Sequence, residues 1–190
     1  MKIGLALGGG VVRGFAHVGV LMALEDAGIR ADVVTGTSVG SIVGAFVAAG
    51  WSCAEISEVT KHLNWQGMAR VAAPWRGGWI SFYKLEQFVD RWLNHAEFSD
   101  LKLPFAAVAT DLITGNPVVI NEGSVAHAVH ASSAVPGIVV PVHVEGQMLS
   151  DGGVSDNLPV RTTRAMGADY VIAVNILGRY WSKANNPLTR

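Results

Sequence analysis

The hydrophobic and polar positions of this chain divide it into short, mostly apolar runs and longer segments with helical spacing. Four of the runs are rich in Val, Ile, Leu and Ala and end at turn residues, which predicts strands buried on both faces of a sheet. They lie at 3–7, 32–35, 105–110 and 170–175. Further runs flank turn residues and predict hairpin strands. They lie at 118–120, 140–144 and 147–149.

The segments between the strands predict helices, and the residues at their ends support this prediction. Gly28 and Gly50 are placed to close two helices, because glycine readily adopts the left-handed conformation of a helix C-cap. Ser52 and Glu55 have the spacing of a capping box. The predicted helices span 14–27, 38–49, 52–63, 81–93, 123–131 and 159–166. Alternating strands and helices predict an α/β fold whose sheet is mostly parallel and covered on both faces.

The segment 64–80 interrupts this alternation. It carries Trp65, Trp75 and Trp79 among glycines, without helical or strand periodicity. Loops of this length are commonly functional or mobile. The segment is either a packed surface loop or an aromatic flap over an apolar site or a lipid surface. We predict that its tryptophans face the site or a lipid surface.

Length and composition indicate one domain. The chain has 190 residues, so we expect a single domain over 1–190 with a core at about 3–175 and a polar tail at 179–190. Charged residues make up 15% of the chain and the net charge is −1, which excludes the basic surface of a nucleic-acid binder.

The apolar residues do not predict a membrane span. Half of the residues are hydrophobic, but no run reaches the roughly 18 apolar residues that a spanning helix needs. The first residues lack a signal-peptide pattern. The one cysteine, Cys53, excludes an intrachain disulfide and fits a reducing compartment. We therefore expect a cytoplasmic protein whose contact with membranes, if it has one, is peripheral.

A G-x-S-x-G motif, Gly36-Thr37-Ser38-Val39-Gly40, stands between the second strand and the following helix. In a nucleophile elbow the serine stands on a strained strand-to-helix turn, and glycines two residues away leave room for the backbone. The helix behind the serine directs its positive dipole toward the reacting oxygen. This context makes Ser38 a candidate nucleophile. The alternative is one more polar residue in a glycine-rich loop.

A second glycine loop, Gly8-Gly9-Gly10, lies between the first strand and the first helix. Gly14 comes one residue late for a dinucleotide fingerprint, and it is not followed by the Lys of a P-loop. What remains is a row of N–H groups at a helix N-terminus, which suits an anion such as the oxyanion of acyl transfer. Arg13 would order this loop or add positive potential, or it is an ordinary surface arginine.

Ser38 needs a proton acceptor, and the sequence offers two candidates. His143 lies near a strand end, eight residues before Asp151. Asp151 follows a short strand, and Gly152 and Gly153 let its carboxylate approach another loop. A partly desolvated carboxylate can take the proton, but Asp-Gly is also a common hairpin turn, so spacing alone leaves both open. The remaining histidines are interpreted as structural: His17, His62, His95, His127 and His130.

Several motifs in this chain follow one another as they do in a known family. GGGVVRG at 8–14, GTSVG at 36–40 and SDGG at 150–153 resemble the patatin-like phospholipases, and the short bacterial patatin-like proteins in particular. ATDLITG at 109–115 and ASSAVPG at 131–137 are also similar to family blocks. Together the motifs cover roughly residues 3–175.

The resemblance implies a three-layer α/β/α fold and a Ser–Asp dyad, with Ser38 as nucleophile and Asp151 as the base that also returns the proton. The N–H groups of Gly8, Gly9 and Gly10 would form the oxyanion hole, and no metal or cofactor would be needed. The implied substrates are acyl lipids: phospholipids, lysophospholipids and some neutral esters. It is the resemblance that favours Asp151 over His143.

The chain departs from the family pattern in two respects. Leu7 stands where many members have an acidic residue, and members are commonly longer, so the chain is either a short form or a fragment. Two other functions stay open beside the dyad hydrolase. One is a Ser-His-Asp esterase that uses His143, and the other is a non-catalytic module that binds a lipid or a protein partner. No pattern in the sequence predicts an oligomeric state.

Overall fold

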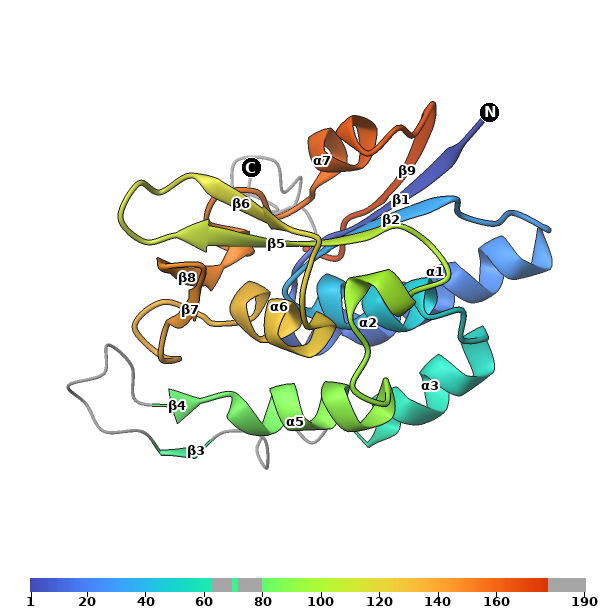
Figure 1. The fold of residues 1–190 in the computed structure, drawn as a ribbon. Helices are drawn as coiled ribbons and strands as arrows, with labels where there is room; N and C mark the ends of the chain where they lie inside the picture. The colour runs from blue at the N-terminus through green and yellow to red at the C-terminus, as the bar shows by residue number, and fades with distance from the viewer. Residues whose placement is uncertain (63–69, 72–79, 178–190) are drawn as a thin grey trace, which may run out of the picture.

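The computed structural model describes residues 1–62, 70–71 and 80–177, which form an α/β sandwich around one large mixed sheet (Figure 1). The tryptophans at 65, 75 and 79 and the predicted tail at 179–190 lie outside the described residues. What the sequence predicts for these two segments therefore stays a prediction.

Parallel strands form the centre of the sheet, and antiparallel strands extend it on one side. The parallel strands follow the order β5-β2-β1-β9, and β6 and β8 both pair with β5 in the antiparallel sense. The strands of this sheet are β1 (Ile3–Leu7), β2 (Val33–Thr37), β5 (Phe105–Asp111), β6 (Pro117–Ile120), β7 (Val142–Val144), β8 (Gln147–Asp151) and β9 (Tyr170–Val174). A separate antiparallel pair consists of β3 (Arg70–Val71) and β4 (Ile80–Ser81).

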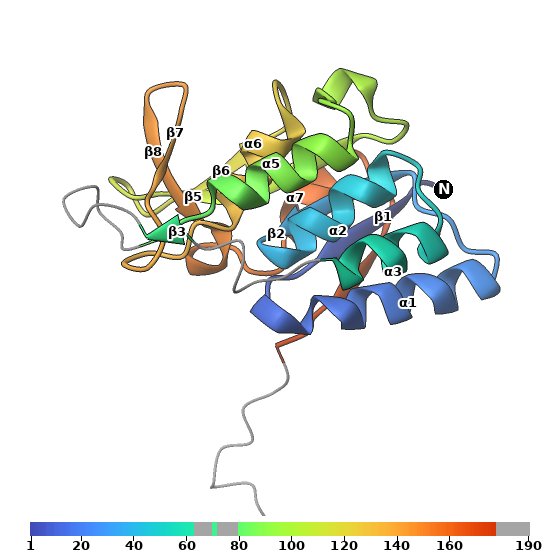
Figure 2. The same ribbon diagram turned by 90° about the horizontal axis from the view of Figure 1, so that it is seen from below.

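Helices cover the two faces of the sheet unequally (Figures 1 and 2). Among the described helices, α7 (Val160–Ala165) lies alone on one face, against β1, β2 and β9. On the other face α2 and α6 pack on the sheet, whereas α3 and α5 form a layer beyond them. The helices of this face are α1 (Phe15–Asp26), α2 (Val39–Ala48), α3 (Cys53–Lys61), α5 (Tyr83–Trp92) and α6 (Val125–Ser132).

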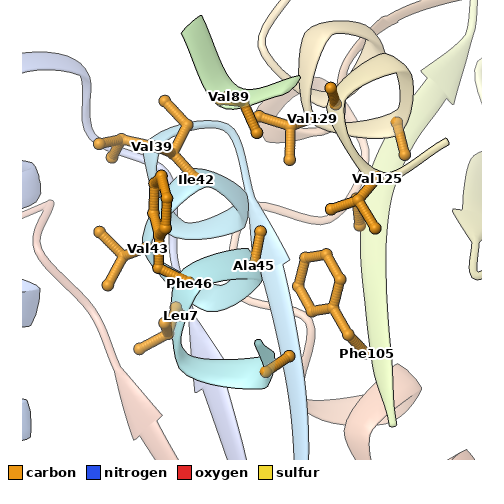
Figure 3. Packing of buried hydrophobic residues seen from close by; sticks show 14 of the residues in the cluster. Leu7, Val39, Ile42, Val43, Ala45, Phe46, Val89, Phe105, Val125 and Val129 are labelled. Carbon is orange, nitrogen blue, oxygen red and sulfur yellow. The ribbon is translucent and has the colours of Figure 1, made fainter. Parts of the chain in front are cut away.

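Helix α2 lies at the centre of the hydrophobic core, because its residues are almost all apolar or small (Figure 3). Ile42 and Phe46 are fully buried, in one cluster with Leu7 of β1, Phe105 of β5 and Val129 of α6. Burying a side chain of this size stabilises the fold by about 1.5–3 kcal/mol. The strong packing of α2 also holds the turn that precedes it firmly against the sheet.

The predicted strands and helices are confirmed, and no end differs by more than two residues. The capping box of Ser52 and Glu55 is present, and Gly28 and Gly50 end their helices with positive φ. One difference matters for function: β2 continues through Thr37, so the strand runs directly into Ser38. The short β3–β4 pair was not predicted, because two-residue strands leave no periodicity. No helix among the described residues is long and apolar enough to cross a membrane.

Candidate active site

Ser38 and Asp151 reach the same place because two strands end toward each other along one edge of β5. Strand β2 pairs with β5 as far as Thr37, which lies opposite Val108. Strand β8 pairs with the following residues of β5, and Asp151 lies opposite Ala109. Strand β6 occupies the other edge of β5 at these same positions, so β2 and β8 share one edge. The residue that follows β2 therefore lies beside the last residue of β8.

The turn at Ser38 is strained and leaves the serine hydroxyl uncommitted to the helix. Ser38 has φ 52° and ψ −125°, a conformation that is costly for a residue with a side chain. It is the N-cap of α2, yet its side chain makes no capping hydrogen bond. Its carbonyl is anchored instead by Ser41, whose N–H and hydroxyl donate to it at 2.8 and 2.6 Å. Strain of this kind persists where the surrounding structure enforces it, as at many functional sites.

The two motif glycines allow the strand and the helix to approach this closely. A Cβ atom on Gly36 would overlap the carbonyl group of Gly40, the second residue of α2. A Cβ atom on Gly40 would overlap the carbonyl group of Leu7 at the end of β1. In both cases the added Cβ would meet backbone atoms, which cannot move aside as the tip of a side chain can. The predicted supporting role of these glycines has a direct physical reason here.

Ser132, the last residue of α6, holds the turn from the other side. Its hydroxyl accepts the N–H of Ser38 at 2.9 Å and donates to the carbonyl of Val108 at 2.6 Å. Ser132 is fully buried; its bond to Val108 is buried as well, and its bond to Ser38 is partly buried. Sequence reasoning noted the ASSAVPG block that contains Ser132 but assigned no role to it. The resemblance of that block to the family was the only available signal.

Asp151 presents a buried carboxyl group to this site. The residue is 7% exposed, and its Oδ1 accepts the N–H of Gly153 at 2.7 Å. Burial raises its pKa above the ordinary value, against hydrogen bonds from Gly153 and Ser38 that lower it. Gly152 lies so close to β5 that a Cβ atom would overlap the carbonyl group of Val108. The two glycines after Asp151 therefore let this turn enter the site, as the motif predicts.

The glycine loop after β1 also lies against Ser38, but two of its three predicted donors are engaged elsewhere. A Cβ atom on Gly9 would be 3.2 Å from the Cβ of Ser38. The N–H of Gly8 donates to Val174 at 3.0 Å, and the N–H of Gly9 donates to Asn157 at 3.1 Å. The N–H of Gly10 has no acceptor within the described part of the chain. The prediction of three free N–H groups is thus corrected: Gly8 and Gly9 hold the loop in place.

His17, interpreted from the sequence as structural, and Asn157, which has no predicted role, fix the glycine loop. The Nε2 of His17 lies 2.8 Å from the carbonyl oxygen of Gly8, and burial lowers the pKa of this histidine. Neutral His17 therefore donates through Nε2–H to that carbonyl. Asn157 uses its backbone carbonyl and its side-chain amide, which donates to the carbonyl of Gly9 at 3.4 Å. The exposed Arg13 donates to the carbonyl of Ile176 at 3.4 Å, which agrees with a loop-ordering role.

His143 lies away from the serine and the aspartate. It is exposed on β7, where it pairs with Met148, three residues before Asp151 on β8. Three residues of strand correspond to about 10 Å. Among the described residues, no histidine ring is hydrogen-bonded to Ser38 or Asp151.

One group of three possible metal ligands occurs among the described residues: Glu86, His127 and His130, on α5 and α6. Neither Ser38 nor Asp151 belongs to this group. The arrangement around Ser38 brings together a serine, a carboxyl group with raised pKa, and a glycine loop in which the N–H of Gly10 has no acceptor among the described residues.

Related sequences extend over nearly the whole chain. An uncharacterized NTE family protein of Mycobacterium tuberculosis is 35% identical over 179 residues, which are 93% of this chain and 49% of that protein. The lysophospholipase nte1 of Aspergillus fumigatus is 33% identical over 183 residues, which are 92% of this chain and 12% of the fungal protein. This chain therefore spans about half of the mycobacterial relative and a small part of the fungal one.

Solved structures and the family comparison agree with the fold described above. VipD from Legionella pneumophila has a TM-score of 0.65 at 17% identity, covering 83% of this chain and 47% of VipD. The type III effector protein ExoU has a TM-score of 0.53 at 18% identity, covering 70% of this chain and 40% of ExoU. Both support a three-layer α/β/α arrangement. Residues 5–164 match the family described as Patatin-like phospholipase, and the chain belongs to this family.

Proposed function

We propose that this chain is a lipid acyl hydrolase that works through a Ser38–Asp151 dyad and an acyl-enzyme intermediate. The observation that carries the proposal is the shared edge of β5, along which β2 and β8 end toward each other. Family membership supports the same chemistry, since the family is described as Patatin-like phospholipase. The name lysophospholipase, carried by the fungal relative, supports an acyl lipid as the substrate.

In the first half of the proposed reaction, Ser38 attacks the ester. Asp151 accepts the hydroxyl proton while the serine Oγ bonds to the carbonyl carbon of the substrate. The negative charge that develops on the carbonyl oxygen is received by the N–H groups of Gly10 and Val39, which have no acceptor among the described residues. One such donor is worth about 2.7–4 kcal/mol in the transition state. The ester C–O bond then breaks, and Asp151 returns the proton to the leaving alcohol.

In the second half, water releases the fatty acid. Asp151 accepts a proton from water as the water oxygen attacks the acyl-serine carbonyl carbon. The tetrahedral intermediate collapses, the bond to Ser38 breaks, and the serine oxygen regains a proton from Asp151. A base works best when its pKa lies near the working pH, and the raised pKa of Asp151 is a shift in that direction.

Exposed apolar side chains favour a lipid substrate and a peripheral contact with a lipid surface. Phe15 follows the glycine loop, Val154 follows the Asp151 turn, and Leu177 follows β9; all three are exposed. The C-terminal ends of β1 and β9 are adjacent, because Leu7 pairs with Val174. These side chains therefore lie at the same end of the sheet as the proposed site, where apolar groups could enter a lipid surface.

The proposal is tested by labelling the protein with a fluorophosphonate probe and mapping the adduct by mass spectrometry. We expect the label on Ser38, no label in Ser38→Ala, and full labelling in the control Ser57→Ala on α3. Turnover of lysophosphatidylcholine, phosphatidylcholine and p-nitrophenyl esters should follow the same pattern. An unlabelled wild-type protein that binds vesicles but turns over none of these substrates would support the non-catalytic module instead.

The choice of base has its own test with a p-nitrophenyl ester. We expect Asp151→Asn to abolish turnover and His143→Ala to leave it within a few-fold of the wild type, because His143 lies about 10 Å along the sheet from Asp151. The reverse pattern would identify a Ser-His-Asp esterase.

A further inference from the structure

Helices α5 and α6 bring three side chains with metal-ligating atoms to one point. Glu86 lies on α5 and His127 and His130 lie on α6, and one ligand atom from each lies within 4.8 Å of the other two. The two helices pack against each other, and Val89 and Val129 of the same helices belong to the hydrophobic core (Figure 3). The backbone that carries the three side chains is therefore held in place by packing.

Both histidine rings present the same nitrogen to the one carboxylate. The Nδ1 of His130 lies 2.6 Å from Oε2 of Glu86, and the Nδ1 of His127 lies 3.3 Å from Oε1. The other nitrogen of His127, Nε2, lies 3.2 Å from the carbonyl oxygen of His143. The other nitrogen of His130 has no hydrogen-bond partner among the described residues, so Glu86 alone orients that ring.

A count of protons shows that this arrangement requires positive charge. The carbonyl of His143 can only accept, so Nε2 of His127 carries a hydrogen. In a neutral ring Nδ1 then holds a lone pair, which faces the Glu86 carboxylate. An ionised carboxylate can only accept hydrogen bonds, so Glu86 in that form cannot donate to this lone pair. Either a second proton on His127 or a cation between the rings and the carboxylate satisfies all three groups.

The donor set matches a divalent transition metal better than an alkaline-earth ion. Two imidazole nitrogens and one carboxylate oxygen, with a fourth position left for water, form a common zinc ligand set. Magnesium and calcium prefer oxygen ligands throughout. Ligand atoms at about 2.0–2.1 Å from a tetrahedral zinc lie roughly 3.3 Å apart. The 3.3 Å distance from His127 Nδ1 to Oε1 of Glu86 already has this value. The 2.6 Å contact of His130 Nδ1 is with the other oxygen, Oε2, so a rotation of the Glu86 or His130 side chain would be needed to place both rings around one oxygen.

The second ring nitrogen of His127 contacts a carbonyl oxygen, that of His143, which would not itself bind the ion. Metal-ligating histidines commonly donate their second ring N–H to a carbonyl or carboxylate, which fixes the ring and its tautomer. Here Nε2–H of His127 meets the carbonyl of His143 on β7, and Nδ1 is left for the ion. A bound ion would thus be supported from the sheet as well as from the two helices.

We propose that Glu86, His127 and His130 form a binding site for zinc or a similar divalent transition metal, which clamps α5 to α6. The metal would be structural, because neither Ser38 nor Asp151 is among its ligands. Its effect would still reach the nucleophile: α6 ends two residues after His130 at Ser132, whose hydroxyl accepts the Ser38 N–H. The proposal stands independently of the hydrolase reaction, since metal binding is measured without substrate.

The test titrates the chelator-treated protein with Zn²⁺ by calorimetry and with Co²⁺ by visible absorption. We expect one Zn²⁺ per chain, the visible bands of tetrahedral Co²⁺, a rise of Tm with Zn²⁺, and no binding of Mg²⁺. His127→Ala and Glu86→Gln should each weaken Zn²⁺ binding by at least 10-fold. His95→Ala is the matched control, because His95 also lies 2.6 Å from a carboxylate, that of Asp90, and this pair belongs to no three-ligand group among the described residues.

Three results would overturn the proposal: no binding of Zn²⁺, binding that both cluster variants leave unchanged, or binding that His95→Ala removes equally. Because Glu86 is half-buried and its replacement could disturb the packing of α5 on α6, His127→Ala is the decisive variant. The side chain of His127 is 40% exposed, so its removal leaves no large cavity. A folded His127→Ala protein that binds Zn²⁺ like the wild type would show that the cluster is only a hydrogen-bonded group.

Discussion

Two aspartates end neighbouring strands of the sheet, yet their surroundings differ. Asp111 ends β5 and Asp151 ends β8, and each residue is 7% exposed. The carboxylate of Asp111 accepts the N–H of Ile113 and the hydroxyl of Thr114, both at 2.9 Å, and these donors lower its pKa. The carboxylate of Asp151 accepts one backbone N–H, from Gly153, and burial raises its pKa.

The comparison shows that the surroundings of the carboxyl group itself, rather than the exposed fraction of the whole residue, decide what each aspartate can do. At Asp111 the donors come from its own turn, and the neighbouring Leu112 and Ile113 are exposed. Its negative charge is therefore well stabilised, and the residue anchors a hairpin. At Asp151 desolvation outweighs the donors, which leaves a carboxylate that takes up a proton more readily. ATDLITG resembles a family block as SDGG does, but its aspartate has a structural explanation.

Replacing each aspartate by asparagine should separate the two roles most strongly. We expect Asp151→Asn to lower kcat about 10⁴-fold, the size of effect seen when the acid member of a catalytic triad becomes an amide. Asp111→Asn should keep activity within a few-fold. Ester hydrolysis under saturating substrate measures both, with circular dichroism as the check on folding. Similar losses in the two folded variants would contradict the assignment.

The glycines of the two turns should respond differently to alanine. A Cβ atom on Gly152 would overlap the backbone of β5 at Val108, so Gly152→Ala should cost about 3 kcal/mol or more in the free energy of unfolding. Gly115 in the Asp111 turn has φ 72° and open space around it, so Gly115→Ala meets only backbone strain of about 1–2 kcal/mol. Urea unfolding measures both, and equal losses would mean that β8 and β5 pack less closely than described.

The sequence predicted features that depend on residues close together in the chain. The capping box of Ser52 and Glu55 and the left-handed cap at Gly28 are local devices, and each occurs where its residue types predict it. Gly36 and Gly40 were predicted for the same reason, because an elbow needs room on both sides of Ser38. Strand and helix positions follow from hydrophobic periodicity, which is local as well.

The contacts that the sequence did not predict join residues far apart in the chain. Ser132 lies 94 positions from Ser38, and Asn157 lies 148 positions from Gly9. No hydrophobic pattern predicts that β8 pairs with β5 at the point where the pairing of β2 with β5 ends. The pairing of Ser38 with Asp151 was therefore predicted from the resemblance to a family. The predicted use of the Gly8 N–H failed for this reason, since its acceptor belongs to the last strand of the sheet.

Removing the hydroxyl of Ser132 should have a moderate effect on catalysis. Ser132→Ala leaves the Ser38 N–H and the Val108 carbonyl without their buried partner, at about 1–3 kcal/mol each. We expect kcat to fall about 10- to 100-fold with KM nearly unchanged, because Ser132 positions the nucleophile without touching substrate. Thr114→Ala removes the hydroxyl of an exposed residue that donates to Asp111, and it should leave kcat unaffected. Restoration of kcat by Ser132→Thr would support positioning, whereas a matched loss in Thr114→Ala would indicate general destabilisation.

The smallest effect concerns stability and has opposite signs for the two aspartates. The folded-state pKa of Asp151 is raised above the ordinary 3.8, so its ionised form costs stability at neutral pH. Asp151→Asn should therefore raise the free energy of unfolding at pH 7, and the gain should shrink as pH falls through the folded-state pKa toward 3.8. The folded-state pKa of Asp111 is lowered, so its ionised form contributes stability that is present above 3.8 and lost as pH falls further.

Asp111→Asn should accordingly lower the free energy of unfolding at pH 7, with a loss that fades in acid. Urea unfolding of both variants and the wild type between pH 7 and pH 3 measures the difference, and the wild-type curve removes the general effect of acid. Desolvation raises the pKa of Asp151 and also destabilises the fold when the carboxylate is ionised. Removing this charge should therefore stabilise the protein, as expected for a carboxylate that serves reactivity at the expense of stability. If both variants lose stability at pH 7, Asp151 is a turn anchor like Asp111 and the proposed base must be sought elsewhere.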